Sequence, residues 1–166
     1  MGTERANTAV TVRPARRDDV AVLVELVREL AVYERAPEEV ELDEHRLAAT
    51  LFRAAPEVFA RVAELDGAIV GMAIFFRNYS TWTGRPGLYL EDLYVQPAHR
   101  RNGVGRALLG ELARVAVAHG CARLEWSVLD WNAPAIAFYE SIGAASRDGW
   151  TLYRISGAQL AELAAR

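Results

Sequence analysis

The sequence predicts a single α/β domain with a central mixed, mostly antiparallel sheet and helices on both of its faces. The chain has 166 residues, of which 52% are hydrophobic and 25% charged, which suits one globular domain. The spacing of its apolar residues is typical of strands in some segments and of helices in others, in the order β-α-α-β-β-β-α-β-α-β. Short turns join the early strands, whereas a strand-helix-strand crossover in the second half requires a parallel pair. We expect the domain to cover residues 8–166, with residues 1–7 as a flexible tail.

The first elements are a strand and two helices. Apolar and polar residues alternate over 10–13, which predicts a strand. Asp18 or Asp19 can cap the next segment, where apolar residues recur at helical spacing over 20–30. Asp43 can cap a second helix that ends before the next proline.

The middle of the chain predicts a hairpin. Two apolar runs, 58–64 and 68–76, flank Asp66-Gly67, a dipeptide that favours a tight turn between antiparallel strands. Three glycine or proline residues within 80–87 then predict a loop. The remaining elements are expected in this order: a strand over 88–95, a helix over 103–119, a strand over 123–129, a helix over 132–143, a strand over 150–155 and a helix over 158–165.

Bulk properties exclude several classes of protein. The net charge of −3 does not favour binding to nucleic acid, and no apolar run is long enough to cross a membrane. The single cysteine, Cys121, excludes an internal disulfide, and the absence of a leader pattern predicts a cytoplasmic protein. Cys121 follows His119 by two residues, but Gly120 between them is better explained as a helix end than as part of a nucleophilic pair. The histidines show no metal-ligand spacing, so no metal is expected.

The segment Arg100-Arg101-Asn102-Gly103-Val104-Gly105-Arg106 predicts an anion site. Two glycines where a helix begins allow close approach of the backbone, and the free N–H groups of the first helical turn favour a phosphate. A dinucleotide fingerprint needs a third glycine that this chain lacks, and a P-loop needs a Gly-Lys-Ser/Thr ending that is absent.

Arg100-x-x-Gly103-x-Gly105, after a strand at 89–95, resembles the acetyl-CoA motif of the GCN5-related N-acetyltransferase (GNAT) family. Asn132-Ala133-Pro134 followed by Phe138-Tyr139 is similar to the second signature of that family. The resemblance implies acetyl-CoA as the co-substrate, with the pyrophosphate on the loop and the pantetheine arm along the preceding strand. The cofactor-binding residues that it implies are Leu93, Tyr94, Val95, Arg100, Arg101, Asn102, Gly103, Val104, Gly105, Arg106, Asn132 and Ala135.

The segments Leu90-Glu91-Asp92-Leu93, Asp130-Trp131-Asn132 and Gly149–Tyr153 are similar to the diamine (spermidine/spermine) N-acetyltransferases and their thialysine-preferring relatives. This resemblance implies Tyr139 as the general acid and Glu91 as a water-mediated base, although Asp92 remains a possible base. The substrate-binding residues that it implies are Tyr33, Glu34, Trp82, Glu91, Asp92, Glu125, Trp126 and Ser127. The chain departs from the polyamine enzymes at Ser80, where they carry an acidic residue, and at Ala135, where they carry serine.

These residue types suit acetyl transfer to an amine. An alkylammonium has a pKa of about 10.4, so a carboxylate must remove a proton before the nitrogen can attack. A tyrosine hydroxyl with a pKa near 10 can then protonate a leaving thiolate in a nearly balanced step. We therefore expect direct acetyl transfer to a primary amine of a diamine, polyamine or lysine-like amino acid. Transfer to a protein or peptide amine and a non-catalytic acyl-CoA sensor are the alternatives, and the family resemblance implies a homodimer.

Overall fold

The computed structural model describes residues 9–166, so the tail predicted for residues 1–7 lies outside the described residues. The chain divides into two compact units, of which the first ends at Ser127 and the second is Val128–Arg166. The limits 8–166 of the predicted domain remain a prediction.

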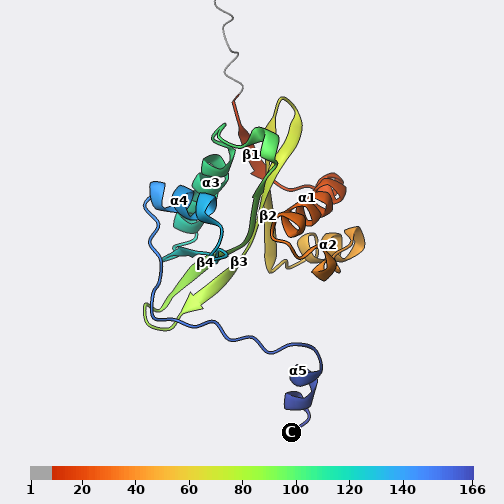
Figure 1. Ribbon diagram of the computed structural model, residues 1–166, viewed down its shortest axis with the longest axis vertical. Coiled ribbons are helices and arrows are strands. Elements are labelled where there is room, and N and C mark those ends of the chain that lie inside the picture. The colour runs from red at the N-terminus through yellow and green to blue at the C-terminus, as the bar shows by residue number, and fades with distance from the viewer. Residues whose placement is uncertain (1–8) are drawn as a thin grey trace, which may run out of the picture. The chain divides into compact units, whose positions relative to one another are not determined.

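The first unit is built on one five-stranded sheet, shown in Figure 1. Its strands follow the order of the chain: β1 (Thr11–Pro14), β2 (Val58–Leu65), β3 (Ala68–Ser80), β4 (Arg85–Val95) and β5 (Leu124–Glu125). The pairs from β1 to β4 are antiparallel, and β4 pairs with β5 in parallel. The predicted mixed, mostly antiparallel sheet is therefore confirmed.

Helices cover both faces of this sheet, as predicted. The helices α1 (Val20–Tyr33) and α2 (Glu44–Leu51) lie on one side, called the α1 face below, and α3 (Val104–Ala118) lies on the other (Figure 1). The core of the α1 face joins residues of both helices to strand residues, among them Leu23, Leu30, Leu47, Val62, Met72, Ile74 and Tyr94. On the opposite face Arg61 of β2 pairs with Glu111 of α3 at 3.3 Å between Nε and Oε1. The short 3-10 turns are Arg17–Asp19, Pro37–Glu39 and Pro97–His99.

One of the two predicted helix caps is confirmed. The Asp43 carboxylate accepts a hydrogen bond from Arg46 N at 2.7 Å and so caps α2. Asp19 precedes α1 but makes no capping hydrogen bond to that helix. Its carboxylate instead accepts hydrogen bonds from Arg13 and from Arg16 N, and Arg13 holds the pKa of Asp19 below its ordinary value. This aspartate therefore joins β1 to the start of α1, a long-range role that local sequence does not reveal.

Two predicted boundaries in the sheet were wrong. The predicted loop over 80–87 is shorter, because β3 continues to Ser80 and β4 already begins at Arg85. The predicted strand over 123–129 is only Leu124–Glu125, because its ladder with β4 holds just two residue pairs. As a result, β4 from Leu90 onward has a strand partner on one edge only within the described residues.

The second unit contains α4 (Ala133–Ser141) and α5 (Gly157–Ala164). Asn132 caps α4, because its Oδ1 accepts a hydrogen bond from Ala135 N at 3.3 Å. The strand predicted over 150–155 was wrong, since this segment has no regular structure. Its large residues suggested a strand, but a strand needs a hydrogen-bonded neighbour, and this unit has none. Trp150, Leu152 and Tyr153 are exposed.

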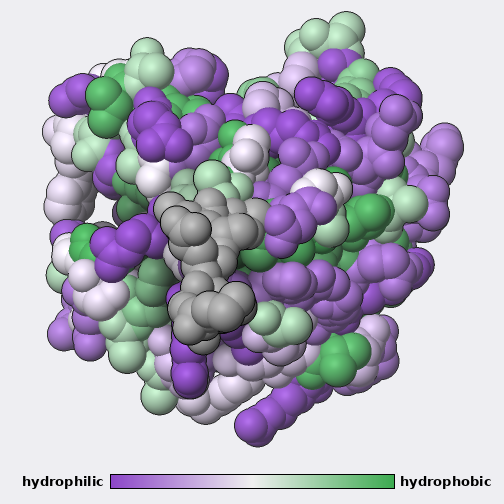
Figure 2. All heavy atoms as spheres, turned by 90° about the horizontal axis from the view of Figure 1, so that it is seen from above, coloured by the Kyte–Doolittle hydropathy of each residue, from purple (hydrophilic) through white to green (hydrophobic). Residues whose placement is uncertain are grey.

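Hydrophilic side chains predominate on the face seen in Figure 2, with hydrophobic ones scattered among them, which is the usual mixture for a surface in water. Over residues 9–166, every helix is too short or too polar to cross a bilayer.

Candidate functional site

A β-bulge interrupts β4 at the two predicted carboxylates. Ile74 of β3 pairs with Asp92, but the next residue, Phe75, pairs with Leu90, so Glu91 has no partner across the ladder. Partners in an antiparallel ladder share a face of the sheet. Asp92 therefore lies on the α1 face beside the core residue Ile74. The inserted residue is what allows Leu90 and Asp92 to point to opposite faces although they are two positions apart.

Asp92 is a desolvated carboxylate within an acidic group. Burial, helped by the nearby charges of Glu91 and Glu34, raises its pKa to about 6. Glu34, just past the end of α1, also has a raised pKa because of partial burial. Between residues 9 and 166, no hydrogen bond or ion pair compensates the Asp92 charge. The acidic group of Glu34, Glu91 and Asp92 is therefore suited to hold a cation.

An aromatic and polar row continues from Asp92 along the α1 face. Phe76 pairs with Tyr89, and their ring centroids lie 5.2 Å apart. Tyr89 in turn pairs with Glu125 of β5, and its hydroxyl lies 2.9 Å from Ser127 Oγ. The structure thus brings Glu125 and Ser127, both predicted to bind substrate, onto the same face as Asp92.

The segment 100–106, called the glycine loop below, has the backbone conformation that an anion site needs. Gly103 precedes α3 in the left-handed conformation with φ 78°, and a Cβ there would meet no atom within 4 Å. Arg101 also has a positive φ of 67°. Ala107 N donates to Gly103 O, so the N–H groups of Val104 to Arg106 precede the first helical hydrogen bond. These donors and the neighbouring arginines fit a phosphate group.

Arg100 has a role that the sequence did not reveal. Its Nε donates to Val95 O at 3.0 Å, and its guanidinium lies 4.9 Å from the Tyr33 ring centroid and 5.7 Å from that of Tyr94. Arg100, predicted from the motif to bind the cofactor, therefore contacts the end of α1. It links the glycine loop to Tyr33, a residue predicted to face the substrate.

Other predicted residues lie elsewhere. Trp82 is 86% exposed in the turn between β3 and β4, and the six residue steps from Ile74 to Ser80 separate it from Asp92 by about 20 Å along the strand. The structure does not bring Trp82 to the acidic group. Trp126 follows β5 between Glu125 and Ser127. Asn132, Ala135 and Tyr139 lie in the second unit, on or next to α4.

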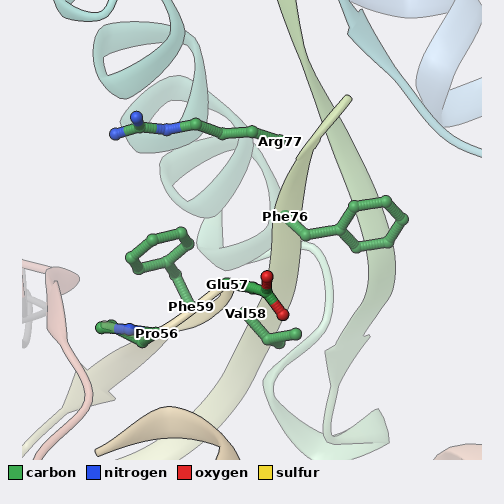
Figure 3. A pocket seen from close by; sticks show the side chains of 6 residues that line it. All are labelled: Pro56, Glu57, Val58, Phe59, Phe76 and Arg77. Atoms are coloured by element: carbon green, nitrogen blue, oxygen red, sulfur yellow. The ribbon is translucent and has the colours of Figure 1, made fainter. Parts of the chain in front are cut away.

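Sequence reasoning also missed a surface hollow of about 470 Å³ at the ends of β2 and β3. It is lined by Pro56, Glu57, Val58, Phe59, Phe76 and Arg77. Figure 3 shows that Phe59 and Arg77 point to one side of the strands and Phe76 to the other. Only the period-2 alternation on the two strands of the predicted hairpin, together with their register, could have indicated it. In the described part of the chain, no cluster of acidic, histidine or cysteine side chains could hold a metal.

Comparisons with known proteins agree with the fold. Residues 22–144 match the model of the Acetyltransferase (GNAT) family. A thialysine N-epsilon-acetyltransferase of Bos taurus is 36% identical over 168 residues, covering 95% of this chain and 98% of the relative. A spermidine/spermine N(1)-acetyltransferase-like protein of Homo sapiens is 31% identical over 92% of this chain, which spans 23% of that longer protein. An integron cassette protein from the mobile metagenome of V. cholerae has the same fold, with a TM-score of 0.79 and 28% identity over 95% of this chain and 98% of that one.

Proposed function

Because the chain belongs to the GNAT family of acetyltransferases, we propose that it transfers the acetyl group of acetyl-CoA to a side-chain amine of a small cationic molecule. The class of acceptor comprises lysine-like amino acids such as thialysine, diamines and polyamines. The observation that carries this proposal is the acidic group of Glu34, Glu91 and Asp92, of which Glu91 and Asp92 lie on β4, the strand that leads into the glycine loop. An ammonium group is the natural ligand of an uncompensated carboxylate.

Proton removal is assigned to Asp92. The resemblance predicts Glu91 for this task, but Glu91 is the exposed bulge residue, whereas Asp92 is desolvated on the face that carries Tyr89 and Glu125. A base with a pKa of about 6 is ionised at neutral pH and still basic enough to take a proton from a bound ammonium, directly or through water. The neutral nitrogen can then attack.

The free edge of β4 supports the predicted place of the pantetheine arm. Acetyl-CoA would supply the activated acetyl group as a thioester. Beyond Tyr89, β4 has no second strand neighbour in the described chain, so backbone groups of Leu93 to Val95 can hydrogen-bond an extended arm and polarise the carbonyl oxygen. Tyr139 is proposed to protonate the leaving thiolate, a role that rests on the Asn132–Tyr139 signature.

The glycine loop is tested with Gly103→Asp. A side chain at φ 78° strains the backbone, and an added carboxylate repels a pyrophosphate, so acetyl-CoA affinity should fall by about 10-fold or more. Isothermal titration with CoA measures the loss. Gly67→Asp is the matched control, because Gly67 has nearly the same φ, 79°, and equal space but lies in the β2–β3 turn. Equal affinity of the Gly103 and Gly67 variants for CoA would contradict the assigned phosphate site.

A panel of amines tests the reaction itself. Release of free CoA from acetyl-CoA should occur with at least one of thialysine, lysine, putrescine and spermidine, and a lysine-containing peptide should react more slowly. A peptide that reacts fastest would redirect the assignment to protein amines. Binding of CoA with no release for any amine would identify a non-catalytic sensor and overturn the proposed reaction.

A further inference from the structure

We propose that the α1 face carries a second subsite, formed by Arg123 and Glu125 with Asn78, which binds the α-ammonium and α-carboxylate of an amino acid. This subsite selects lysine-like amino acids over diamines. The inference deepens the proposed function and rests on it, because the side-chain amine of the same molecule would lie at Asp92.

The strand register places these groups in line with Asp92. Asn78 pairs with Gly87, Phe76 with Tyr89, and Ile74 with Asp92, so the three β3 residues, spaced by two, share the α1 face. Glu125 joins this face as the neighbour of Tyr89. Arg123 lies two residues before Glu125 and contacts it, on the same side of the sheet.

The spacing matches the length of a lysine side chain. Two residues along a strand separate the level of Asp92 from the level of Tyr89 and Glu125, a distance of about 7 Å. Five bonds join the side-chain nitrogen of an extended lysine to its α-carbon, which spans about 6 Å. An acceptor whose amine contacts Asp92 would therefore present its α-carbon at the level of Glu125. Ornithine, one methylene shorter, remains within reach of long side chains there.

The charges of the subsite match a zwitterion. Arg123 Nε lies 2.6 Å from Glu125 Oε2, and Asn78 Nδ2 donates to the same oxygen at 3.1 Å. The side chains of Arg123 and Glu125 are each 37% exposed, so both remain accessible. An α-ammonium can pair with the carboxylate while an α-carboxylate takes the planar guanidinium. A diamine would bring only positive charge beside Arg123, which disfavours it.

The cluster is not satisfied by its own hydrogen bonds. In the described chain, the buried side-chain polar atoms without a hydrogen bond are Asn78 Oδ1 and Arg123 Nε, and both belong to this cluster. Arg123 Nε and Glu125 Oε2 therefore form an ion pair, but the Nε–H group does not point at the oxygen and makes no hydrogen bond to it. Unmade hydrogen bonds of buried groups are costly and uncommon in proteins, so these two atoms call for a partner from outside the cluster.

Gly87 makes room for this arrangement. A Cβ at Gly87 would collide with Asn78 Oδ1 and would lie 3.2 Å from Arg123 Cγ. The strand therefore carries its smallest residue at the point where Asn78 and Arg123 converge. This packing fixes the two side chains beside Glu125, as a specificity site requires.

Pairs of amines that differ only by the α-carboxylate test the subsite: lysine against cadaverine, and ornithine against putrescine. The intact protein should show a kcat/KM about 10- to 100-fold higher for each amino acid than for its diamine. Arg123→Gln should lower kcat/KM for lysine and ornithine by about the same factor and leave kcat/KM for cadaverine and putrescine unchanged or higher, because a like charge is removed. Arg123→Lys should restore part of the preference, because it keeps the charge.

Arg77→Gln is the matched control, since it removes a positive charge from the adjacent position of β3 on the opposite face. It should keep the full preference for amino acids. Equal rates with lysine and cadaverine in the intact protein, or an equal loss for both in Arg123→Gln, would overturn the subsite and leave acetyl transfer intact. If none of these four amines is acetylated, and neither thialysine nor spermidine is, the proposed function would instead be overturned. Thermal melting of each variant identifies any loss caused by unfolding.

Discussion

Replacing Tyr139 with phenylalanine is expected to lower kcat by about 100- to 10,000-fold while acetyl-CoA binds as before. The substitution removes one hydroxyl and keeps the ring, which lies 5.5 Å from that of Phe138 in α4. Without a proton donor the thiolate must leave as an anion, so the loss should fall on turnover and not on binding. Steady-state rates with the best amine of the panel and titration with CoA measure the two effects separately.

Tyr153→Phe provides the control for this substitution. Tyr153 lies in the same unit, is 90% exposed and has no role in the proposed reaction, so its hydroxyl should be dispensable. A Tyr139→Phe variant that turns over like Tyr153→Phe would remove Tyr139 as the general acid. The thiolate would then be protonated by water.

Asp92→Asn is expected to abolish the acidic limb of the pH profile of kcat/KM and to lower the rate at neutral pH by about 100-fold or more. The Asp92 carboxylate must be ionised to receive a proton, and burial raises its pKa to about 6. Activity of the intact protein should therefore fall as the pH drops through about 6, and this fall should be absent in the variant. Rates measured from pH 5 to pH 9 with one amine test this expectation.

The Asp92→Asn substitution should affect folding stability and activity in opposite directions at neutral pH. A carboxylate with a raised pKa in the folded state favours folding in its protonated form, and this contribution is lost as the pH rises through about 6. At neutral pH the ionised Asp92 is a cost that asparagine does not carry. Asp92→Asn should therefore melt at a temperature equal to or above that of the intact protein at pH 7, which separates loss of the base from loss of fold.

Glu91→Gln distinguishes the two neighbouring carboxylates. Because Glu91 is exposed at the bulge, its amide variant should lose less activity than Asp92→Asn and should keep the acidic limb. If Glu91→Gln instead removes that limb, and loses more rate at neutral than at high pH, Glu91 is the base that the family resemblance implied. The two variants remove the same charge one residue apart, so each serves as the control for the other.

Local signals predicted much of the fold. Asp43 caps its helix, Asp66-Gly67 forms its turn and Gly103 begins α3, because each depends on a few adjacent residues. The β-bulge at Glu91 could not be predicted, since one extra residue leaves no mark on the hydrophobic pattern of so short a strand. Without it the faces of Glu91 and Asp92 cannot be assigned. The strand expected over 150–155 failed for a related reason, because strand formation depends on a partner and not on alternation alone.

The position of Arg100 shows the limit of motif reasoning. The motif identifies a basic residue at the start of the loop, and its sequence neighbours suggest a phosphate ligand. In the folded chain its guanidinium lies against the rings of Tyr33 and Tyr94, which are distant in sequence. Tertiary contacts of this kind determine which charged side chains of a motif face a ligand.

The bulge at Glu91 also divides β4 into two segments that can change independently. Before the bulge, Gly87 and Tyr89 belong to the part of the α1 face that would bind the acceptor. After the bulge, Leu93 to Val95 form the strand edge that would bind the pantetheine arm of the cofactor. Because these acceptor-facing positions lie before the bulge and the cofactor edge lies after it, substitutions in the first segment change side chains that do not belong to the second. A protein built this way can acquire a new acceptor by mutation while its donor chemistry stays the same, and redesign of its substrate range should begin between Gly87 and Leu90.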